Sequence, residues 1–436
     1  MKAFNTFSAA MLGVGTMVGV GIFIVIGLAG SIAGNLVWIS FVIGGIIAML
    51  SGYSLAKLAI RYPSRGGIIE YIVQEFGENS LSGAFSVMFY FAQIIALAAI
   101  AKSFGEYSAR LFGYHSIFAI NSFAIGVILF FTIINLLGAT FVAKSENIIV
   151  ITKLSALVIF TIAAFFTIKP EYLSIKDAPP LINSIYAIGL TFFAYQGYSV
   201  ITNAIEDMQN PKKTILKAMF LAISIVIILY VSVSIAVLGN LPLSEVIKAK
   251  DYALAEAAKP IFGEIGFKIM AIVALISATS AINATLYATT EISYTLAKKG
   301  ELPKIYEYNV FNSFEGLIIS SALIIPLILF LNLTEITTVA ALSVLIIQAI
   351  VHFGHIKLTN KTGAKKIIII LTFILMSFVV IITLYYNAKE DIKIIYYLFL
   401  GFFVSLIIEI ILRLFTNRVI KKQIKSLTEE FIKFKE

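Results

Sequence analysis

Apolar residues run along this chain in long blocks, and short polar segments separate one block from the next. Most blocks reach the length of about 20 residues that a helix needs to cross the hydrocarbon core of a bilayer. Because hydrocarbon offers no partner to a backbone N–H or C=O group, such segments are expected to be helical. The pattern predicts an all-α polytopic membrane protein with 12 transmembrane helices, at residues 6–30, 36–56, 82–109, 117–138, 146–168, 182–204, 214–238, 265–296, 317–331, 335–354, 367–387 and 394–415.

The composition agrees with lipid as the main solvent. Hydrophobic residues make up 60% and charged residues 13% of the 436 residues, whereas a soluble domain is about half apolar and roughly a quarter charged. The chain has no cysteine and only three histidines, so we expect neither a metal site nor a cofactor. His352 and His355 fall at the cytoplasmic end of the tenth predicted helix, and we expect both to lie at the membrane interface.

Lysine and arginine predict the orientation of the chain. With the N-terminus in the cytoplasm, 22 of the 33 basic residues fall on the cytoplasmic side and 10 on the outer side, as the positive-inside rule requires. Both termini are then cytoplasmic, and the net charge of +9 reflects topology and contact with anionic lipid rather than nucleic acid. Residues 416–436 interleave apolar residues with lysines, which is typical either of a cationic amphipathic tail on the membrane or of a solvated tail.

The first predicted helix is rich in glycine, which weakens a helix because it leaves the backbone loosely held. Its glycines are Gly13, Gly15, Gly19, Gly21 and Gly27. Gly15 and Gly19 form a GxxxG pair, so one interpretation is close packing against another helix. The other is a break at Gly19–Gly21, where unwound backbone and the positive end of a half-helix would hold a carboxylate in mid-membrane.

A second candidate break lies five helices later, in the sixth predicted helix. Gly197 sits there among aromatic and polar residues in the run TFFAYQGYSV. Interruptions at corresponding places in two halves of a chain indicate a transporter built from inverted repeats, with its binding site between the breaks. An aromatic packing cluster with an incidental glycine is the alternative.

Lys153 lies deep in the fifth predicted helix, about 10 Å from its start at a rise of 1.5 Å per residue. Charge inside a membrane is costly and indicates function, unless the side chain snorkels to the cytoplasmic interface. Burial disfavours the charged form of a lysine, so a buried Lys153 could gain and lose a proton near neutral pH. We expect its partners to be backbone carbonyls and hydroxyls, and the eighth predicted helix supplies Ser277 and Ser280 among others.

Four segments carry a family resemblance. They are the GVGIF end of the glycine-rich run, YPSRGGIIEYI at Tyr62–Ile72, EDMQNPKKTILKAM at Glu206–Met219 and ISYTLAKKGELP at Ile292–Pro303. Together they resemble the amino acid–polyamine–organocation (APC) superfamily over nearly the whole chain. They match its first broken helix, its Pro–x–x–Gly–Gly loop, its Glu–x–x–x–Asn–Pro–Lys signature and the exit of its eighth helix.

The resemblance implies a LeuT-like fold with two inverted five-helix repeats, at residues 1–170 and 181–355. Two further helices would occupy 364–415, followed by the cytoplasmic tail at 416–436. The resemblance also implies that backbone N–H groups of the first break receive an amino acid carboxylate, and that carbonyls of the sixth helix receive the amino group. The substrate-binding residues would be Gly19, Val20, Gly21, Phe193 (the aromatic gate), Ala194 and Tyr195, and we add Gln93 as a pocket wall.

Lys153 matches a lysine of the proton-coupled, sodium-independent branch of the superfamily, whose ammonium fills the place of a sodium ion. Its implied partners are the Gly15 carbonyl and the hydroxyl of Ser277 or Ser280. The superfamily often carries a glutamate where this chain has Ser199. With no carboxylate in the expected pocket, a cationic substrate side chain would be buried unpaired, so neutral amino acids are favoured.

We therefore expect a proton-coupled symporter of neutral amino acids in the inner membrane, working by alternating access. Its partners would be the amino acid, protons and the lipid bilayer. An amino acid exchanger and a sodium-coupled carrier are alternatives with the same fold. A membrane-embedded enzyme is the alternative from another class, but the sequence has no P-loop, no HExxH motif and no Ser/His/Asp set at membrane depth.

Overall fold

The computed structural model describes residues 4–19, 21–64, 67–137 and 140–415, without the side chains of residues 140–147, 177 and 415. Helices dominate these residues, and the only strands among them are two-residue β1 (Asn309–Val310) and β2 (Ser313–Phe314), which pair antiparallel. The helices, with η for a 3₁₀ helix, are α1 (Thr6–Met17), α2 (Gly21–Ala33), η1 (Gly34–Leu36), α3 (Val37–Arg61), α4 (Ile68–Phe76), α5 (Ser80–Leu111), α6 (Ile117–Leu137), α7 (Thr140–Phe165), η2 (Pro170–Leu173), η3 (Ile175–Asp177), α8 (Leu181–Tyr186), α9 (Ile188–Ala194), η4 (Gln196–Ser199), α10 (Val200–Asn203), η5 (Ile205–Asp207), α11 (Pro211–Asn240), α12 (Leu243–Lys248), α13 (Ala253–Glu256), α14 (Lys259–Lys299), η6 (Lys304–Glu307), α15 (Glu315–Phe330), α16 (Leu333–Thr362), α17 (Lys366–Glu390) and α18 (Ile392–Phe415).

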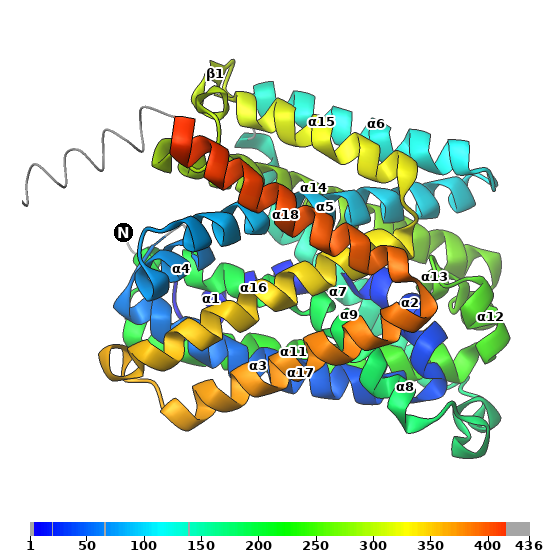
Figure 1. Cartoon of the computed structure of the whole chain (residues 1–436). Coiled ribbons are helices and arrows are strands. Elements are labelled where there is room, and N and C mark those ends of the chain that lie inside the picture. Colours follow the sequence, from blue (N-terminus) through cyan, green and yellow to red (C-terminus); the bar gives the residue numbers. More distant parts are fainter. Residues whose placement is uncertain (1–3, 20, 65–66, 138–139, 416–436) are drawn as a thin grey trace, which may run out of the picture.

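Every one of the 12 predicted segments contains a helix. Among the described residues, nine helical runs are long and apolar enough to cross a membrane, and one of them, Gly21–Arg61, joins α2 and α3 through η1. Three shorter apolar helices, α1, α8–α9 and α15, lie in the first, sixth and ninth predicted segments. The long helices run side by side between two ends of the molecule (Figure 1).

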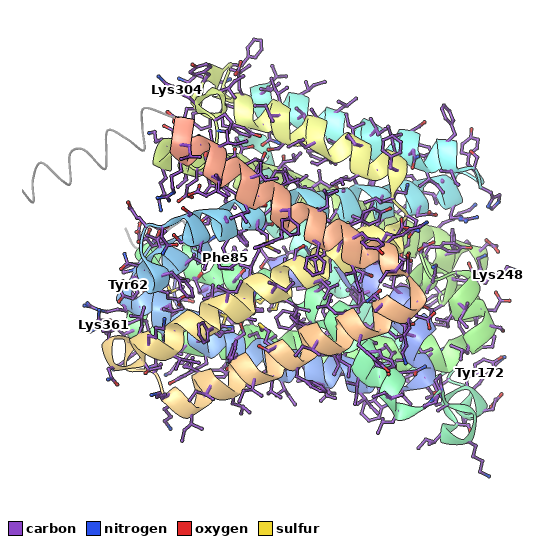
Figure 2. All side chains as sticks on the ribbon, viewed as in Figure 1. Tyr62, Phe85, Tyr172, Lys248, Lys304 and Lys361 are labelled. Atoms are coloured by element: carbon purple, nitrogen blue, oxygen red, sulfur yellow. The ribbon has the colours of Figure 1, made fainter. Side chains whose placement is uncertain are left out.

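Charged residues of the connections gather at these two ends. Lys304 and Lys361 lie at one end together with Tyr62, whereas Lys248 and Tyr172 lie at the opposite end (Figure 2). The topology predicted from the lysines and arginines assigns the first three residues to the cytoplasmic side and the other two to the outer side. The separation fits that topology, and which end faces the cytoplasm stays a prediction.

Large apolar side chains cover the outside of the bundle between its ends. Ile133 on α6, Ile228 on α11 and Ile381 on α17 are 57%, 68% and 65% exposed. A water-soluble monomer rarely exposes a wide apolar surface. These helix faces are therefore suited to contact with lipid.

Some segments differ from the sequence prediction or fall outside the structure. α16 continues to Thr362, eight residues beyond its predicted end, and stops where Gly363 adopts a left-handed conformation with φ of 63°. The connection between α11 and α14 holds two short helices, α12 and the single turn α13. Val20 and the predicted tail at 416–436 lie outside the described residues.

Candidate functional site

The first and sixth predicted spans are both interrupted. α1 ends at Met17 and α2 begins at Gly21, and Val18 between them has non-helical backbone angles (φ −77°, ψ 54°). In the sixth span the chain leaves α9 after Ala194, passes through η4 and continues as the single turn α10. The prediction that these two helices break is confirmed by these bounds.

The two breaks lie against each other. The Thr16 hydroxyl donates to the Gly197 carbonyl at 2.9 Å. A Cβ added to Gly197 would overlap the backbone of Thr16 and Met17, and a Cβ added to Gly21 would lie 3.2 Å from the Cα of Ala194. Glycine at position 197 is therefore required by the close approach of α1, because the backbone of α1 occupies the space of a side chain.

The last carbonyls of α1 receive no hydrogen bond from within the helix and need donors from elsewhere. The Gly15 carbonyl accepts from Lys153 Nζ at 2.7 Å. The Met17 carbonyl accepts from the hydroxyl of Tyr230 on α11 at 2.6 Å, and the same hydroxyl lies 3.3 Å from the Ala194 carbonyl at the end of α9. One tyrosine that no sequence pattern distinguished therefore joins the ends of both broken helices.

Lys153 lies inside the bundle rather than at its surface. Its side chain is 2% exposed, so the alternative of a lysine that snorkels to the interface is wrong. Its ammonium contacts the carbonyl end of α1, where the helix dipole favours a positive charge. Ser277 on α14 is buried, but its hydroxyl has no hydrogen-bond partner among the described residues and so does not bond Lys153 here. Ser280, also on α14, is buried as well.

The other residues of the expected site occupy different surroundings. Phe193 and Ala194 form the last turn of α9, directly before the break. The Tyr195 hydroxyl donates to the Phe41 carbonyl on α3 at 2.9 Å, so that side chain bonds α3. Gln93 is half-buried on α5, and no hydrogen bond within the described part of the chain links it to either break.

Known proteins share this sequence over nearly its full length. The profile of a family described as amino acid permease matches residues 4–408. The chain belongs to the amino acid permease family.

Three relatives illustrate the range of similarity to this permease. An uncharacterized protein of Methanocaldococcus jannaschii is 38% identical over 420 residues, which are 96% of this chain and 97% of that protein. The inner membrane transport protein YbaT of Escherichia coli is 31% identical over 94% of this chain and 96% of its own. The serine/threonine exchanger SteT of Bacillus subtilis is 27% identical over 69% of each chain.

Family membership decides the class of the molecule. The permease is a multi-pass membrane protein of the APC superfamily and a transporter of an amino acid or a related solute. The expectation that it is not an enzyme is confirmed because the family is one of transporters. Membership also implies a LeuT-like fold and a small, amino-acid-like substrate.

The two histidines of α16 face the interior of the protein. His352 and His355 are both 0% exposed, because α16 continues beyond them and packs against α3, and their depth in the membrane stays a prediction. His352 Nε2 lies 2.7 Å from Ser51 Oγ, and its Nδ1 lies 2.9 Å from Ser54 Oγ. The Ser54 hydroxyl also lies 2.8 Å from His355 Nδ1.

This chain of hydrogen bonds continues to the break in the sixth span. Gln348 Oε1 accepts from Ser51 Oγ at 3.1 Å and from the Tyr198 hydroxyl at 2.6 Å, and its amide donates to Gln196 Oε1 at 3.1 Å. Hydroxyl, amide and imidazole groups thus tie η4 to α3 and α16. The spacing of these residues in the sequence could have indicated the network. The two serines of α3 are three residues apart, and so are the two histidines of α16, which places each pair on one helix face.

We predict that Tyr230→Phe destabilises the permease, because it leaves the buried Met17 carbonyl without a donor. The loss should be about 1–3 kcal/mol, measured as a lower melting temperature of the purified protein in detergent. Tyr287→Phe is the matched control, since Tyr287 lies on α14 with 57% of its surface exposed. Equal melting temperatures for the two variants would contradict the bridging role of Tyr230.

We also predict that His352→Ala is destabilising, because it removes the group that bonds two buried serine hydroxyls. The expected loss is again about 1–3 kcal/mol, read from the melting temperature. His115→Ala serves as the control, since His115 is an exposed histidine of the α5–α6 connection. A His352→Ala protein as stable as the control would show that the hydrogen-bond chain does not support η4.

Proposed function

We propose that this permease is a proton-coupled symporter of neutral amino acids that works by alternating access. The observation that carries the proposal is the contact between Lys153 and the Gly15 carbonyl, at 2.7 Å and almost fully buried. A charge-assisted hydrogen bond of this kind is stronger than one between neutral groups. The protonation state of Lys153 is therefore coupled to how firmly the end of α1 is held against α7.

The coupling runs through the broken helix. Gly15 lies in the last turn of α1, directly before the break. Protonated Lys153 stabilises the negative end of α1, and loss of the proton weakens that hold because the neutral amine is a poorer donor. In the proposed cycle the proton enters from the outside and leaves toward the cytoplasm, and α1 moves away from α7 as it leaves. Ser280 is the hydroxyl we assign to the same proton-coupling group.

The substrate would lie between the two breaks. α2 begins at Gly21, and its first N–H groups have no acceptor within the helix and lie at the positive end of its dipole. We assign the carboxylate of the amino acid to the backbone of Gly19, Val20 and Gly21, of which Val20 lies outside the described residues.

The amino group would be held by carbonyls at the end of α9. The Ala194 carbonyl accepts from Tyr230 at 3.3 Å and the Tyr195 carbonyl from the Tyr198 N–H at 3.2 Å. A carbonyl has two lone pairs, so each keeps one for a substrate ammonium. Phe193 is assigned as the aromatic gate beside them.

The proposal includes the arrangement of the whole chain. It has 12 spans, with α8–α10 together as the sixth, and two inverted repeats at 1–170 and 181–355 followed by two helices at 364–415. Gln93 on α5 is assigned as a pocket wall. Both termini would be cytoplasmic, with the tail at 416–436 on the inner face, and the protein would reside in the inner membrane, where the name of the relative YbaT places that protein.

An amino acid exchanger is the second candidate function. The similarity to the serine/threonine exchanger SteT favours it, at 27% identity over 69% of each chain. An exchanger moves one amino acid inward for each one outward, so it needs a loaded vesicle and no proton gradient. Uptake into empty proteoliposomes driven by a pH gradient separates symport from exchange, and a strict sodium requirement would instead indicate a sodium-coupled carrier.

We predict that Lys153→Ala lowers uptake driven by a pH gradient by about tenfold or more, the factor expected from losing one charge-assisted hydrogen bond. Counterflow of the same labelled amino acid between loaded vesicles should continue and no longer depend on pH. The measurement compares both assays in proteoliposomes across a range of pH values. Lys169→Ala is the control, because Lys169 is an exposed lysine just after α7. Unchanged pH-dependent uptake in Lys153→Ala would remove this lysine from the mechanism.

A further inference from the structure

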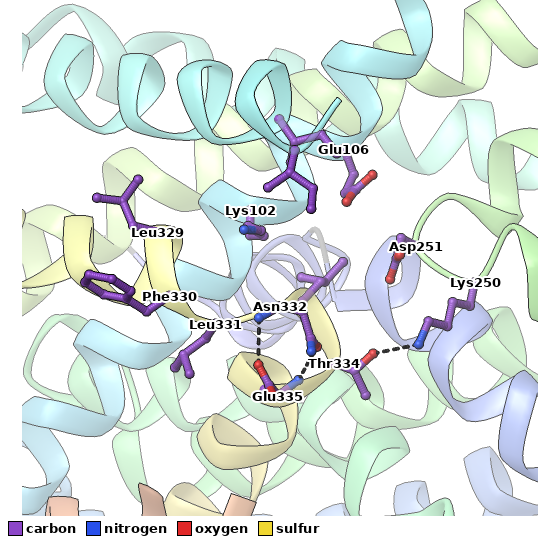
Figure 3. A pocket seen from close by; sticks show the side chains of 13 residues that line it. Lys102, Glu106, Lys250, Asp251, Leu329, Phe330, Leu331, Asn332, Thr334 and Glu335 are labelled. Carbon is purple, nitrogen blue, oxygen red and sulfur yellow. Dashed lines mark hydrogen bonds between the residues drawn. The ribbon is translucent and has the colours of Figure 1, made fainter. Parts of the chain in front are cut away.

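A cavity of about 500 Å³ opens at the end of the bundle that the topology places outside. It is built from four parts of the chain: the last turns of α5, the start of α6, the turn between α12 and α13, and the connection from α15 to α16. Lys102 and Glu106 of α5 face Lys250 and Asp251 of the turn across this space (Figure 3). None of the residues assigned to the central site lines it.

The charged groups of the cavity are buried or half-buried, and they make no close ion pairs with one another in the described part of the chain. Glu106 is 8% exposed, and one of its carboxylate oxygens has no hydrogen-bond partner. One oxygen of Asp251 is likewise buried and unpartnered. No ion pair joins Lys102, Glu106, Lys250 or Asp251 to another residue in the described part of the chain. Buried charges are costly unless they are paired, so this arrangement calls for a partner that brings charges of its own.

The positive groups leave room for the same partner. Lys102 is 5% exposed, and its ammonium donates to Asn121 Oδ1 at 2.6 Å and to the Ile328 carbonyl at 2.7 Å. An ammonium has three N–H donors, so one remains. Lys250 donates to the Thr334 hydroxyl at 3.1 Å (Figure 3) and also keeps donors.

Two further charges, Glu335 and Arg110, belong to the surroundings of the four charged residues. Glu335 accepts from the Asn332 backbone N–H at 2.8 Å and so caps α16 (Figure 3). Arg110 lies one turn beyond Glu106 on α5 and stacks over the Tyr252 ring at 4.8 Å. Glu335 lines the cavity, whereas Arg110 does not line it, although the charge of Arg110 acts on both Glu106 and Asp251.

We propose that this cavity is an outer binding site for a zwitterionic amino acid with an apolar side chain. Lys102 receives its carboxylate, and Glu106 and Asp251 receive its ammonium. The apolar side chain lies against the wall formed by Ile117, Ile120, Leu329 and Phe330. The choice of an amino acid rests on the proposed function, while the need for a ligand with both charges rests on the cavity itself.

Both charged walls of the cavity touch α2, the helix that starts at the first break. Tyr107, next to Glu106, donates its hydroxyl to the Phe23 carbonyl of α2 at 3.1 Å. On the other wall, the Lys250 carbonyl occupies the space that a Cβ at Gly27 would need. An amino acid that bridges the two walls would therefore link two segments that both contact α2, the helix that follows the first break.

The absence of cysteine from the sequence allows a direct test by single-cysteine labelling. Ile117→Cys places a thiol on the cavity wall at a position that is 72% exposed, and Ile175→Cys places one on η3 at a position that is 78% exposed. Each variant in proteoliposomes is reacted with a membrane-impermeant methanethiosulfonate reagent, with and without a millimolar mixture of neutral L-amino acids. We expect the mixture to slow labelling of Ile117→Cys about tenfold at saturation and to leave Ile175→Cys unchanged.

The role of each charge is tested with ligand analogues that lack one charge and with protein variants that lack one carboxylate. N-acetyl amino acids lack the ammonium and amino acid amides lack the carboxylate, so neither should protect Ile117→Cys. Adding Glu106→Gln or Asp251→Asn should raise the half-protecting concentration about tenfold, the effect of losing one charge-assisted hydrogen bond. If either of these variants fails to fold, the analogues alone decide the question in the Ile117→Cys protein.

Three results would overturn the inference. Labelling that is unaffected while the same amino acids are taken up would reject the outer site and leave the proposed function intact. Protection that both analogues reproduce, or that Glu106→Gln and Asp251→Asn leave unchanged, would show that the charges do not bind the ligand. Neither protection nor uptake with any neutral amino acid would reject this site and the proposed function together.

Discussion

The carbonyl groups at the end of α1 must find hydrogen-bond donors inside the protein, because the surrounding hydrocarbon supplies none. Lys153 from α7 and Tyr230 from α11 are those donors for Gly15 and Met17. Both come from segments more than a hundred residues further along the chain. The break in the first span therefore exists only in the folded protein, and its position depends on how α7 and α11 are placed.

The same constraint connects the two breaks to each other. Thr16 bonds the Gly197 carbonyl, and Tyr230 reaches the carbonyls at the ends of both α1 and α9. A shift of one broken helix would therefore strain the bonds that hold the other. This shared set of bonds is a physical reason for the two half-helices to move together during transport rather than independently.

Polar groups are arranged differently on the two sides of the breaks. On the side that the predicted topology places inside, hydroxyl, amide and imidazole groups such as those of His352 and Gln348 bond one another in a continuous chain. On the opposite side, the carboxylates of Glu106 and Asp251 keep oxygens without partners beside a cavity. The first side is thus closed by contacts that the protein makes with itself, and the second keeps groups that a solute can satisfy.

Sequence reasoning identified the positions whose chemistry is unusual for a membrane helix. A lysine at Lys153 and glycines at the two breaks stand out against an apolar background, and the structure places them together. Tyr230 was not identified and His352 was assigned to the membrane interface, because an aromatic or imidazole ring near other apolar residues looks the same whether or not it bonds a distant carbonyl or hydroxyl. Glu106 was not identified either, since hydropathy does not reveal which charges face a common cavity.

By itself, the sequence determined where the chain is helical and which helices are apolar enough to cross a membrane, and its glycines marked two places where a helix could break. These properties follow from the hydropathy and the backbone freedom of each segment taken alone. Only the tertiary structure decided which side chain donates to each carbonyl at the end of α1, which buried hydroxyl has no partner and which charges line a common cavity. Those are relations between segments far apart in the chain, and they depend on distances of a few ångströms that packing alone sets.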